Sequence, residues 1–345
     1  MHYLVTGHTG FKGAWLTLML LERGHAVSGL SLEPTPGSLY ERARLSELVR
    51  HDLRVDIRDA GATRRAITEI RPDVVLHLAA QPLVRESYRD PRSTYETNTL
   101  GTFSVLEAVE RTPSVKAQVV ITTDKVYRNV NQIWGYRESD PLGGVDPYSA
   151  SKAAADLITQ SWMAGAGRAV PTAIARAGNV IGGGDVCAER LMVDLVAAFS
   201  TGEPVRLRYP DAVRPWQHVL DCLNGYLELT EALLRGEGSG EAFNFGPGTD
   251  SFVAVGAMAT AVASLWGLDC VVELAEGTHV HEAELLALDS RKAELRLGWR
   301  DRIGFQDALA WTVDWEKRVR AGEDARAVTV AQIRSFARVS TGPER

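Results

Sequence analysis

Tyr148 and Lys152 stand four residues apart, a spacing that places both side chains on one face of a helix. A phenol held beside a fixed ammonium has its phenolate stabilised, so Tyr148 could act as a base near neutral pH. Lys152 could in addition hold the ribose of a nucleotide. The spacing alone is common by chance, and its meaning depends on what precedes it in the chain.

A polar triplet upstream adds further acid and base groups. Residues 119–122 read as the end of a buried strand, and Thr123, Asp124 and Lys125 follow it directly. Because the carboxyl ends of parallel strands face the ligand crevice, we expect these side chains in the same site as Tyr148. A hydroxyl, a carboxyl and an amine together exceed what a simple alcohol oxidation requires. The alternative is a turn in which Asp124 caps the next segment.

A glycine loop, with Gly7, Gly10 and Gly13, lies between a predicted strand and a predicted helix. Such a loop turns tightly, lets a pyrophosphate approach the backbone, and aims a helix N-terminus at the anion. An acid at the end of the second strand usually holds the ribose, but Ser31 occupies that position and Glu33 follows two residues later. No Arg or Lys stands there to meet a 2′-phosphate, which favours NAD over NADP.

The elements that must position these residues alternate between strand and helix. Strands are predicted at 3–6, 25–31, 53–56, 74–78 and 117–123, and helices at 14–22, 62–70 and 94–110. This alternation predicts an α/β fold, a doubly wound parallel (Rossmann-type) sheet with a smaller mixed α/β substrate domain. We expect an NAD-binding domain with the catalytic residues at 1–180 and a mainly substrate-binding domain at 181–320, with chain crossings. Residues 305–320 read as an amphipathic helix and 321–345 as a polar, loosely packed tail.

Composition narrows the class of protein. The chain has 345 residues and a formal net charge of −6, which argues against nucleic acid or an anionic membrane as a partner. Its three cysteines are too scattered for a disulfide framework, no stretch suits a membrane span, and no His, Asp or Glu spacing suggests a metal. We expect a cytoplasmic protein. Only six residues are lysine, and three of them, Lys12, Lys125 and Lys152, lie in the motifs above.

These motifs resemble those of the extended short-chain dehydrogenase/reductases that modify nucleotide sugars, and among these the CDP-glucose 4,6-dehydratases. The resemblance extends over nearly the whole chain. The segments that carry it are 7–13, 77–85, 122–125, 134–138, 140–144, 146–152, 176–185, 214–219, 244–247 and 281–283.

The resemblance implies a reaction. Tyr148, helped by Thr123, would take the proton of the sugar 4-hydroxyl while the C4 hydrogen moves to NAD as hydride. Lys125 stands where the base for the C5 proton is expected, and Asp124 can protonate the departing 6-hydroxyl. Return of the hydride to C6 would give a 4-keto-6-deoxy sugar. A lysine at its reference pKa of about 10.4 is protonated at neutral pH. Lys125 is therefore either a neutral base or a charged group that stabilises the enolate.

The resemblance also implies binding residues and an assembly. The expected cofactor contacts are Gly7, Thr9, Gly10, Phe11, Lys12, Gly13, Ser31, Asp56, Ile57, Leu78, Ala79, Ala80, Asn98, Thr122, Tyr148 and Lys152. The expected contacts to a nucleotide-diphosphate sugar are Gln81, Arg85, Thr123, Asn179, Arg190, Arg208, Arg214 and His281. Relatives commonly pair the helices near 94–110 and 148–164, so we expect a homodimer or a dimer of dimers.

Some positions depart from the usual pattern of the subgroup and leave the nucleotide and the sugar open. They are Val126, Arg128, the stretch 130–133 and Tyr209. A nucleotide-sugar 4-epimerase shares the glycine loop and the Tyr-x-x-x-Lys spacing, but it does not need Asp124 and Lys125. A 5,6-dehydratase variant that returns hydride to C4 stays open. A non-enzymatic NAD-binding regulatory protein usually loses the Tyr and Lys that are present here.

Overall fold

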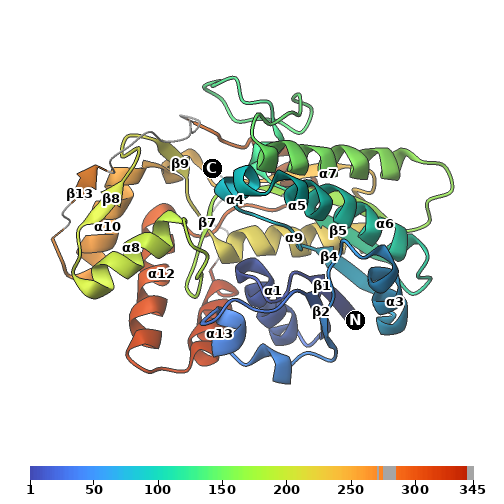
Figure 1. Cartoon of the computed structure of the whole chain (residues 1–345), viewed down its shortest axis with the longest axis horizontal. Coiled ribbons are helices and arrows are strands. Elements are labelled where there is room, and N and C mark those ends of the chain that lie inside the picture. Colours follow the sequence, from blue (N-terminus) through green and yellow to red (C-terminus); the bar gives the residue numbers. More distant parts are fainter. Residues whose placement is uncertain (270–271, 275–284, 340–345) are drawn as a thin grey trace.

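A seven-stranded parallel sheet forms the centre of the molecule (Figure 1). The computed structural model describes residues 1–269, 272–274 and 285–339. The strand order is β11-β6-β5-β4-β1-β2-β3, so the direction of winding reverses between β1 and β4. The predicted doubly wound fold is confirmed, and the reversal point is where such sheets bind ligands. The strands are β1 (His2–Thr6), β2 (Ala26–Ser31), β3 (Asp52–Arg54), β4 (Val74–His77), β5 (Ala117–Ile121), β6 (Thr172–Ala177) and β11 (Ala242–Phe245).

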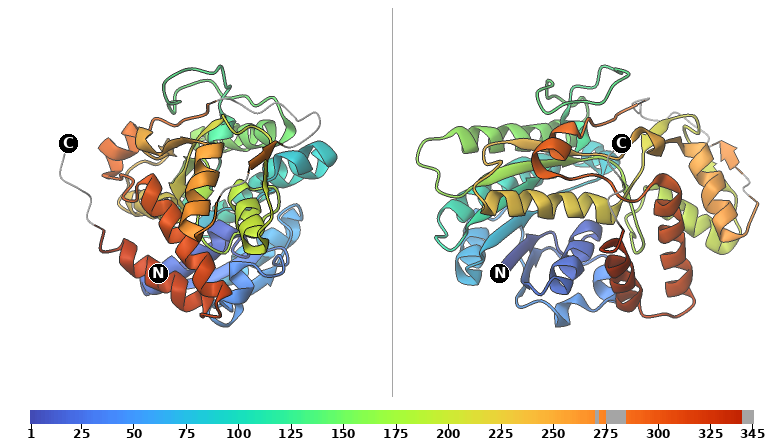
Figure 2. Two further views of the ribbon diagram at one scale, coloured as in Figure 1. Left: turned by 90° about the vertical axis from the view of Figure 1, so that its left-hand side faces the viewer. Right: turned by 180° about the vertical axis from the view of Figure 1, so that it is seen from behind.

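Helices cover both faces of this sheet because its strands are apolar on both sides (Figure 2). Leu4 and Val75 face one side with α3 (Ala60–Ile70) and α6 (Thr102–Glu110). Their neighbours Tyr3 and Val5 face the other side, where α1 (Phe11–Glu22) and α9 (Val219–Leu234) pack. Further short elements are α2 (Leu39–Arg42), η1 (Leu45–Glu47), α4 (Val84–Arg89), η3 (Asp124–Val126), η4 (Thr249–Ser251) and α11 (Arg291–Leu297).

The helix predicted at 94–110 is interrupted. The structure has α5 (Pro91–Tyr95), a π-helical turn η2 (Glu96–Gly101) and then α6. π-helical turns are rare and are frequently found at functional sites. This one contains the buried Asn98 and packs against α7 (Pro147–Ala164), the helix that carries Tyr148 and Lys152.

A smaller unit of short strands and helices lies beside the sheet (Figure 1). It is built from α8 (Leu191–Thr201), α10 (Val255–Trp266) and the strand pairs β7 (Val180–Ile181) with β10 (Gln217–His218), β9 (Val213–Pro215) with β12 (Phe252–Ala254), and β8 (Val205–Leu207) with β13 (Val272–Leu274). Between these pieces the chain returns to the central sheet, to which it adds α9 and β11.

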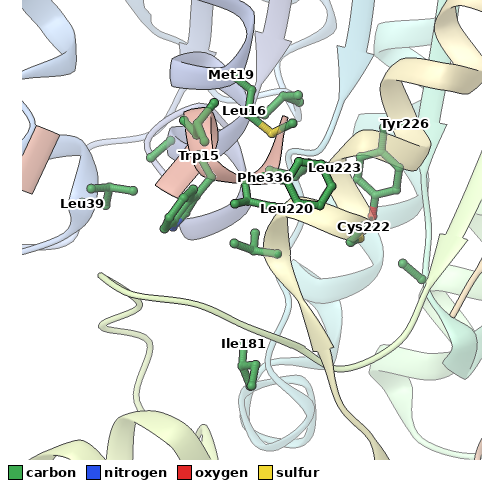
Figure 3. Packing of buried hydrophobic residues seen from close by; sticks show 14 of the residues in the cluster. Trp15, Leu16, Met19, Leu39, Ile181, Leu220, Cys222, Leu223, Tyr226 and Phe336 are labelled. Atoms are coloured by element: carbon green, nitrogen blue, oxygen red, sulfur yellow. Dashed lines mark hydrogen bonds between the residues drawn. The ribbon is translucent and has the colours of Figure 1, made fainter. Parts of the chain in front are cut away.

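The expectation of a loosely packed tail from residue 321 is wrong for much of that segment. After α12 (Phe305–Arg320), which has the predicted bounds, α13 (Ala325–Phe336) packs against α1 (Figure 2). Phe336 lies among Leu16 and Met19 of α1 (Figure 3), and Trp315 donates a 2.8 Å hydrogen bond from Nε1 to Thr329 Oγ1. The buried positions of α13 recur at helical spacing, a signal that the polar composition of the segment hides. Among the described residues, no helix could cross a lipid bilayer.

Candidate active site

The glycine loop lies at the reversal point of the sheet, between β1 and α1. Gly7 has a φ of +77°, and a Cβ placed on it would lie 2.8 Å from Ala79 N. A Cβ on Gly13 would lie 2.1 Å from Gly7 O, so the loop itself requires both glycines. At Gly10 the helix α1 begins with no side-chain cap and no acid in its first turn. Its first N–H groups are therefore available to an anion, which fits the diphosphate of a dinucleotide.

The residues beside the loop tie it to two strand ends. Thr9 donates from its backbone N to Ser31 Oγ at 3.4 Å and from Oγ1 to Leu32 O at 3.2 Å, which joins the loop to the end of β2. The segment Leu78, Ala79 and Ala80 follows β4, and Ala79 N donates to Thr6 Oγ1 at 3.2 Å. The structure thus brings these predicted cofactor residues to one edge of the sheet.

Other predicted cofactor residues have their polar groups occupied by the protein. The Asp56 carboxylate accepts hydrogen bonds from Arg58, which lower the pKa of Asp56. Asn98 is fully buried and exchanges hydrogen bonds with the backbone of Gln81, and it donates from Nδ2 to Ser151 Oγ at 2.9 Å. The side chain of Gln81 is in turn bonded to Leu83 and Thr94. Asn98 and Gln81 therefore hold the π-helical turn against α7 and the loop after β4.

The polar triplet follows β5 as predicted, and two of its three side chains are buried. Thr123 Oγ1 donates to Asp124 Oδ1 at 2.7 Å and accepts from Lys125 N at 3.4 Å. Thr123, and not Asp124, caps the short helix η3. Burial raises the pKa of Asp124, although the hydrogen bond from Thr123 and the charge of Lys125 act in the opposite direction. Asp124 can therefore keep its proton at a higher pH than an exposed aspartate.

Helix α7 brings Tyr148 and Lys152 to the same place. The helix starts at Pro147, where Asp146 Oδ1 accepts from Ser149 N at 2.9 Å. Lys152 Nζ donates to Ile121 O at 2.9 Å, so the ammonium lies at the end of β5. Burial lowers the pKa of Lys152 to about 8.

Burial favours the uncharged phenol over the phenolate at Tyr148. Burial raises the pKa of Tyr148 to about 12, while a hydrogen bond with Thr123 and the charge of Arg190 lower it. The cation that sequence reasoning paired with Tyr148 does not outweigh the loss of water around the phenol. These contacts place the buried Thr123, Asp124 and Lys152 and the half-buried Tyr148 in one cluster.

A buried ion pair behind this cluster was missed by sequence reasoning. Arg176 of β6 and Asp156 of α7 are both fully buried, with 2.8 Å between Arg176 Nη2 and Asp156 Oδ1. Thr122 donates from Oγ1 to Asp156 Oδ2 at 3.0 Å, so this predicted cofactor residue turns its hydroxyl toward the ion pair. The sequence contains one signal for Asp156, its spacing. It follows Lys152 by one helical turn, so both side chains lie on the same face of α7.

Lys12 reaches away from the glycine loop toward α9. Its Nζ lies 3.4 Å from the hydroxyl of Tyr226, a buried residue that sequence reasoning did not single out. Tyr226 and Cys222 face each other along α9 (Figure 3), with 3.1 Å between the hydroxyl and Sγ. The charge of Lys12 contributes to the lowered pKa of Lys152.

Two further predicted cofactor residues are apolar and pack within the protein. Phe11, next to Lys12, lies close to Gly182, and Ile57 is buried against Gly101.

The predicted substrate residues lie on several elements. Arg190 precedes α8 and forms a 2.7 Å ion pair with Asp185, while its charge acts on Tyr148. Arg85 of α4 forms an ion pair in which its Nη1 lies 3.3 Å from Glu189 Oε1. Asn179 follows β6, Arg208 follows β8, and Arg214 lies on β9. His281 lies outside the described residues.

Comparison with known proteins gives the family. The family described as GDP-mannose 4,6 dehydratase matches residues 4–312 of the chain. The chain belongs to this family. CDP-glucose 4,6-dehydratase of Salmonella typhimurium (strain LT2) is 42% identical over 346 residues, covering 98% of this chain and 96% of the relative. The dTDP-glucose 4,6-dehydratase of Streptomyces griseus is 31% identical, covering 93% and 95%.

Solved structures agree with this assignment. DesIV, a dTDP-glucose 4,6-dehydratase from Streptomyces venezuelae solved with NAD and TYD bound, has a TM-score of 0.82 and 28% identity. The match covers 94% of this chain and 100% of that one. The predictions of a nucleotide-sugar 4,6-dehydratase and of a lyase are confirmed at the level of the family.

Titration of Lys152 should be visible in the stability of this dehydratase without ligands. Above about pH 8 the folded chain loses the Lys152 proton, whereas the unfolded chain keeps it up to about pH 10.5. The free energy of unfolding of the wild type, minus that of Lys152→Met, should therefore rise across this window by roughly 3 kcal/mol. Denaturant titrations at a series of pH values measure it. Lys116→Met, which changes an exposed lysine, is the control and should show no such rise. A flat difference for Lys152→Met would contradict a buried, depressed lysine.

Proposed function

We propose that the protein binds NAD and converts CDP-glucose into CDP-4-keto-6-deoxyglucose. The observation that carries the proposal is the cluster at the end of β5, where Thr123 bonds Asp124 and Tyr148, and Lys152 donates to the last residue of the strand. Lys125 follows Asp124 directly and bonds Thr123 through its backbone N. The choice of CDP-glucose is supported by the relative that is 42% identical over nearly the whole chain. The choice of NAD is supported by its presence in the solved structure of DesIV.

The chain's own groups fit the cofactor. The glycine loop and the uncapped start of α1 would hold the diphosphate, with Thr9 and Ser31 toward the adenosine and Lys152 toward the nicotinamide ribose. When bound, NAD would take the C4 hydrogen of the sugar as hydride and return it at C6. Thr122, Asn98 and Gln81 act as positioning residues in this proposal, because their side chains are bonded within the protein.

Oxidation at C4 needs a base for the 4-hydroxyl, and we assign it to Tyr148. The pKa of about 12 that burial gives Tyr148 must fall, so that Tyr148 first releases its own proton to solvent and the resulting phenolate can accept this one. Thr123 already lowers the pKa of Tyr148 by hydrogen bonding, and so does the charge of Arg190. In the proposed complex Arg190 lies on the substrate side of Tyr148 and Lys152 on the cofactor side, and a cation on either side stabilises the phenolate. The proton of the sugar 4-hydroxyl then passes to the Tyr148 oxygen.

Elimination of water needs a second acid and base, which we assign to Asp124 and Lys125. The 4-keto group acidifies the C5 hydrogen, and Lys125, after releasing its own proton to solvent, takes that proton. The C6–O bond then breaks, and the oxygen leaves as water with the proton from Asp124. Burial raises the pKa of Asp124, which keeps the acid protonated for this step.

The substrate's diphosphate requires local cations despite the chain's negative net charge. Arg190 is the candidate nearest to the catalytic cluster, since its charge acts on Tyr148. Arg85 forms an ion pair with Glu189, the residue that precedes Arg190 in the chain. We propose that Arg190, Arg85, Arg208, Arg214 and Asn179 form the nucleotide side of the substrate site. His281, outside the described residues, is proposed as a further substrate contact from the family resemblance alone. A guanidinium can bind a phosphate through two hydrogen bonds.

Pairing of two copies is also part of the proposal. Four apolar side chains are exposed on adjoining helices, with Tyr95 on α5, Leu100 in η2, Phe103 on α6 and Leu157 on α7. Such a patch is typical of a protein–protein interface. We propose a homodimer or dimer of dimers built on this face, which sedimentation equilibrium of the purified chain can measure.

A panel of nucleotide sugars tests the substrate. CDP-glucose should be consumed at least about 10-fold faster than UDP-, dTDP- or GDP-glucose, because a pocket built for one base leaves polar groups unpaired with another. The product should have lost one water and should absorb in alkali as a 4-keto sugar. A product of unchanged mass would indicate a 4-epimerase, and binding without turnover would indicate a regulatory protein.

Exchange of the C5 hydrogen with deuterated water tests Lys125. Lys125→Gln should slow this exchange by at least about 100-fold, because removal of a general base typically costs that much. Lys125→Arg keeps a cation but supplies no neutral amine and should be equally slow. Lys116→Gln is the control for loss of a lysine. Exchange at the wild-type rate in Lys125→Gln would refute the base role, and recovery in Lys125→Arg would assign Lys125 to charge stabilisation.

A further inference from the structure

An arginine lies where sequence reasoning found none. Strands β2 and β3 run side by side, and their register pairs Ser31 with Arg54. The backbone N of Val55 donates to Ser31 O at 3.0 Å, so the two strand ends are held together. The sequence prediction that no Arg or Lys stands at the end of the second strand is therefore wrong for the folded chain, in which Arg54 lies beside Ser31. Arg54 comes from the neighbouring strand, and linear spacing does not show it.

The guanidinium of Arg54 has three partners. Arg54 Nη1 donates to Asp52 Oδ1 at 2.6 Å, Nη2 donates to Tyr40 Oη at 2.8 Å, and Nε donates to Glu33 Oε2 at 3.2 Å. Glu33 is the acid that follows Ser31 by two residues. The group defined by Arg54, Glu33, Asp52 and Tyr40 is called the strand-end cluster below.

The two carboxylates of the strand-end cluster are held very differently. Asp52 also accepts hydrogen bonds from Tyr40 Oη at 2.5 Å and lies 2.7 Å from His8 Nε2, and its side chain is 20% exposed. The side chain of Glu33 is 80% exposed, and the Arg54 guanidinium is its one partner among the hydrogen bonds found in the described residues. Asp52 is thus fixed, whereas the Glu33 carboxylate can accept other donors or move away.

The cluster lies on the adenosine side of the glycine loop. Thr9 of that loop contacts both Ser31 and Leu32, the two residues before Glu33. In dinucleotide-binding folds an acid at this edge accepts the ribose hydroxyls of NAD, and an arginine at this edge binds the 2′-phosphate of NADP. This chain has both groups, and they are bonded to each other.

We propose that Glu33 and Arg54 form a masked cofactor-selectivity site. Glu33 accepts the ribose hydroxyls of NAD and at the same time covers Arg54, which binds a 2′-phosphate when Glu33 is removed. The inference rests on the proposed binding of NAD.

Charge supports the proposal. With Arg54 positive, Asp52 and Glu33 negative and buried His8 neutral, the strand-end cluster carries one net negative charge, which repels a phosphate. Burial lowers the pKa of His8, which keeps that imidazole uncharged. Glu33→Gln removes the net negative charge and frees the Nε–H and one face of the guanidinium. The remaining bonds to Asp52 and Tyr40 hold the guanidinium in place, so the site is preorganised for an anion.

Equilibrium binding of NAD and NADP to the full chain, stripped of bound nucleotide, tests this. The wild type should prefer NAD. In Glu33→Gln the NAD dissociation constant should rise and the NADP dissociation constant should fall, each by about 10-fold, the effect of one hydrogen bond to a charged group. The preference should therefore change by about 100-fold. Glu69→Gln, an exposed glutamate on α3, is the matched control and should leave both constants unchanged.

A second variant isolates Arg54. Adding Arg54→Gln to Glu33→Gln should remove the gain in NADP binding, and Arg54→Lys in the same background should retain part of it at low salt. Near-ultraviolet circular dichroism checks that each variant is folded. An unchanged NAD/NADP preference in Glu33→Gln would overturn the proposal, and so would a gain in NADP binding that persists without Arg54. A wild type that binds neither dinucleotide would instead contradict the proposed function.

Discussion

The buried ion pair between Arg176 and Asp156 joins the three elements on which the site depends. Arg176 belongs to β6, Asp156 to α7, and Thr122 at the end of β5 donates to the same carboxylate. Two charges without water are costly unless their hydrogen bonds are satisfied. Here Arg176 also donates to Tyr127 Oη and Glu138 O, and Asp156 also accepts from Gln160. The pair therefore fixes where β5 ends relative to α7. Thr123 stands one residue from this point, and Lys152 stands one helical turn away.

Burial has one electrostatic consequence for the whole cluster. It raises the pKa of Asp124, raises that of Tyr148 to about 12 and lowers that of Lys152 to about 8. Each shift favours the uncharged form of its group. Burial therefore brings the pKa of Lys152 closer to neutral and keeps Asp124 and Tyr148 protonated over a wider pH range than in water. Because little water screens these groups, a charge brought in by a bound cofactor or substrate should shift the pKa values of Asp124, Tyr148 and Lys152 further.

Much of the fold followed from local sequence signals. The glycine loop, the strands of the sheet and the helix Phe305–Arg320 depend on periodicity and spacing, which are visible in a single sequence. The polar triplet after β5 and the Tyr-x-x-x-Lys pair are likewise local, and the structure brings them together. Helix α13 was missed because its buried face includes the polar Thr329 and Gln332, so the helical period of its buried positions is hard to see in the sequence.

What the sequence could not show depends on contacts between distant segments. Arg54 meets Glu33 because β3 pairs with β2, and Arg176 meets Asp156 because β6 lies under α7. Asn98 and Gln81 read as ligand contacts, yet they bond each other and the elements around them. In each case a polar residue found a protein partner that only the folded chain brings near.

In the proposed reaction one active site, formed by bound NAD and the cluster at the end of β5, oxidises C4, eliminates water across C5 and C6, and reduces C6. CDP-glucose labelled with deuterium at C4 tests it most directly, with the product read by NMR and mass spectrometry. The expected product is a 4-keto-6-deoxy sugar with the label at C6 of the same molecule. Label that remains at or returns to C4 would contradict it.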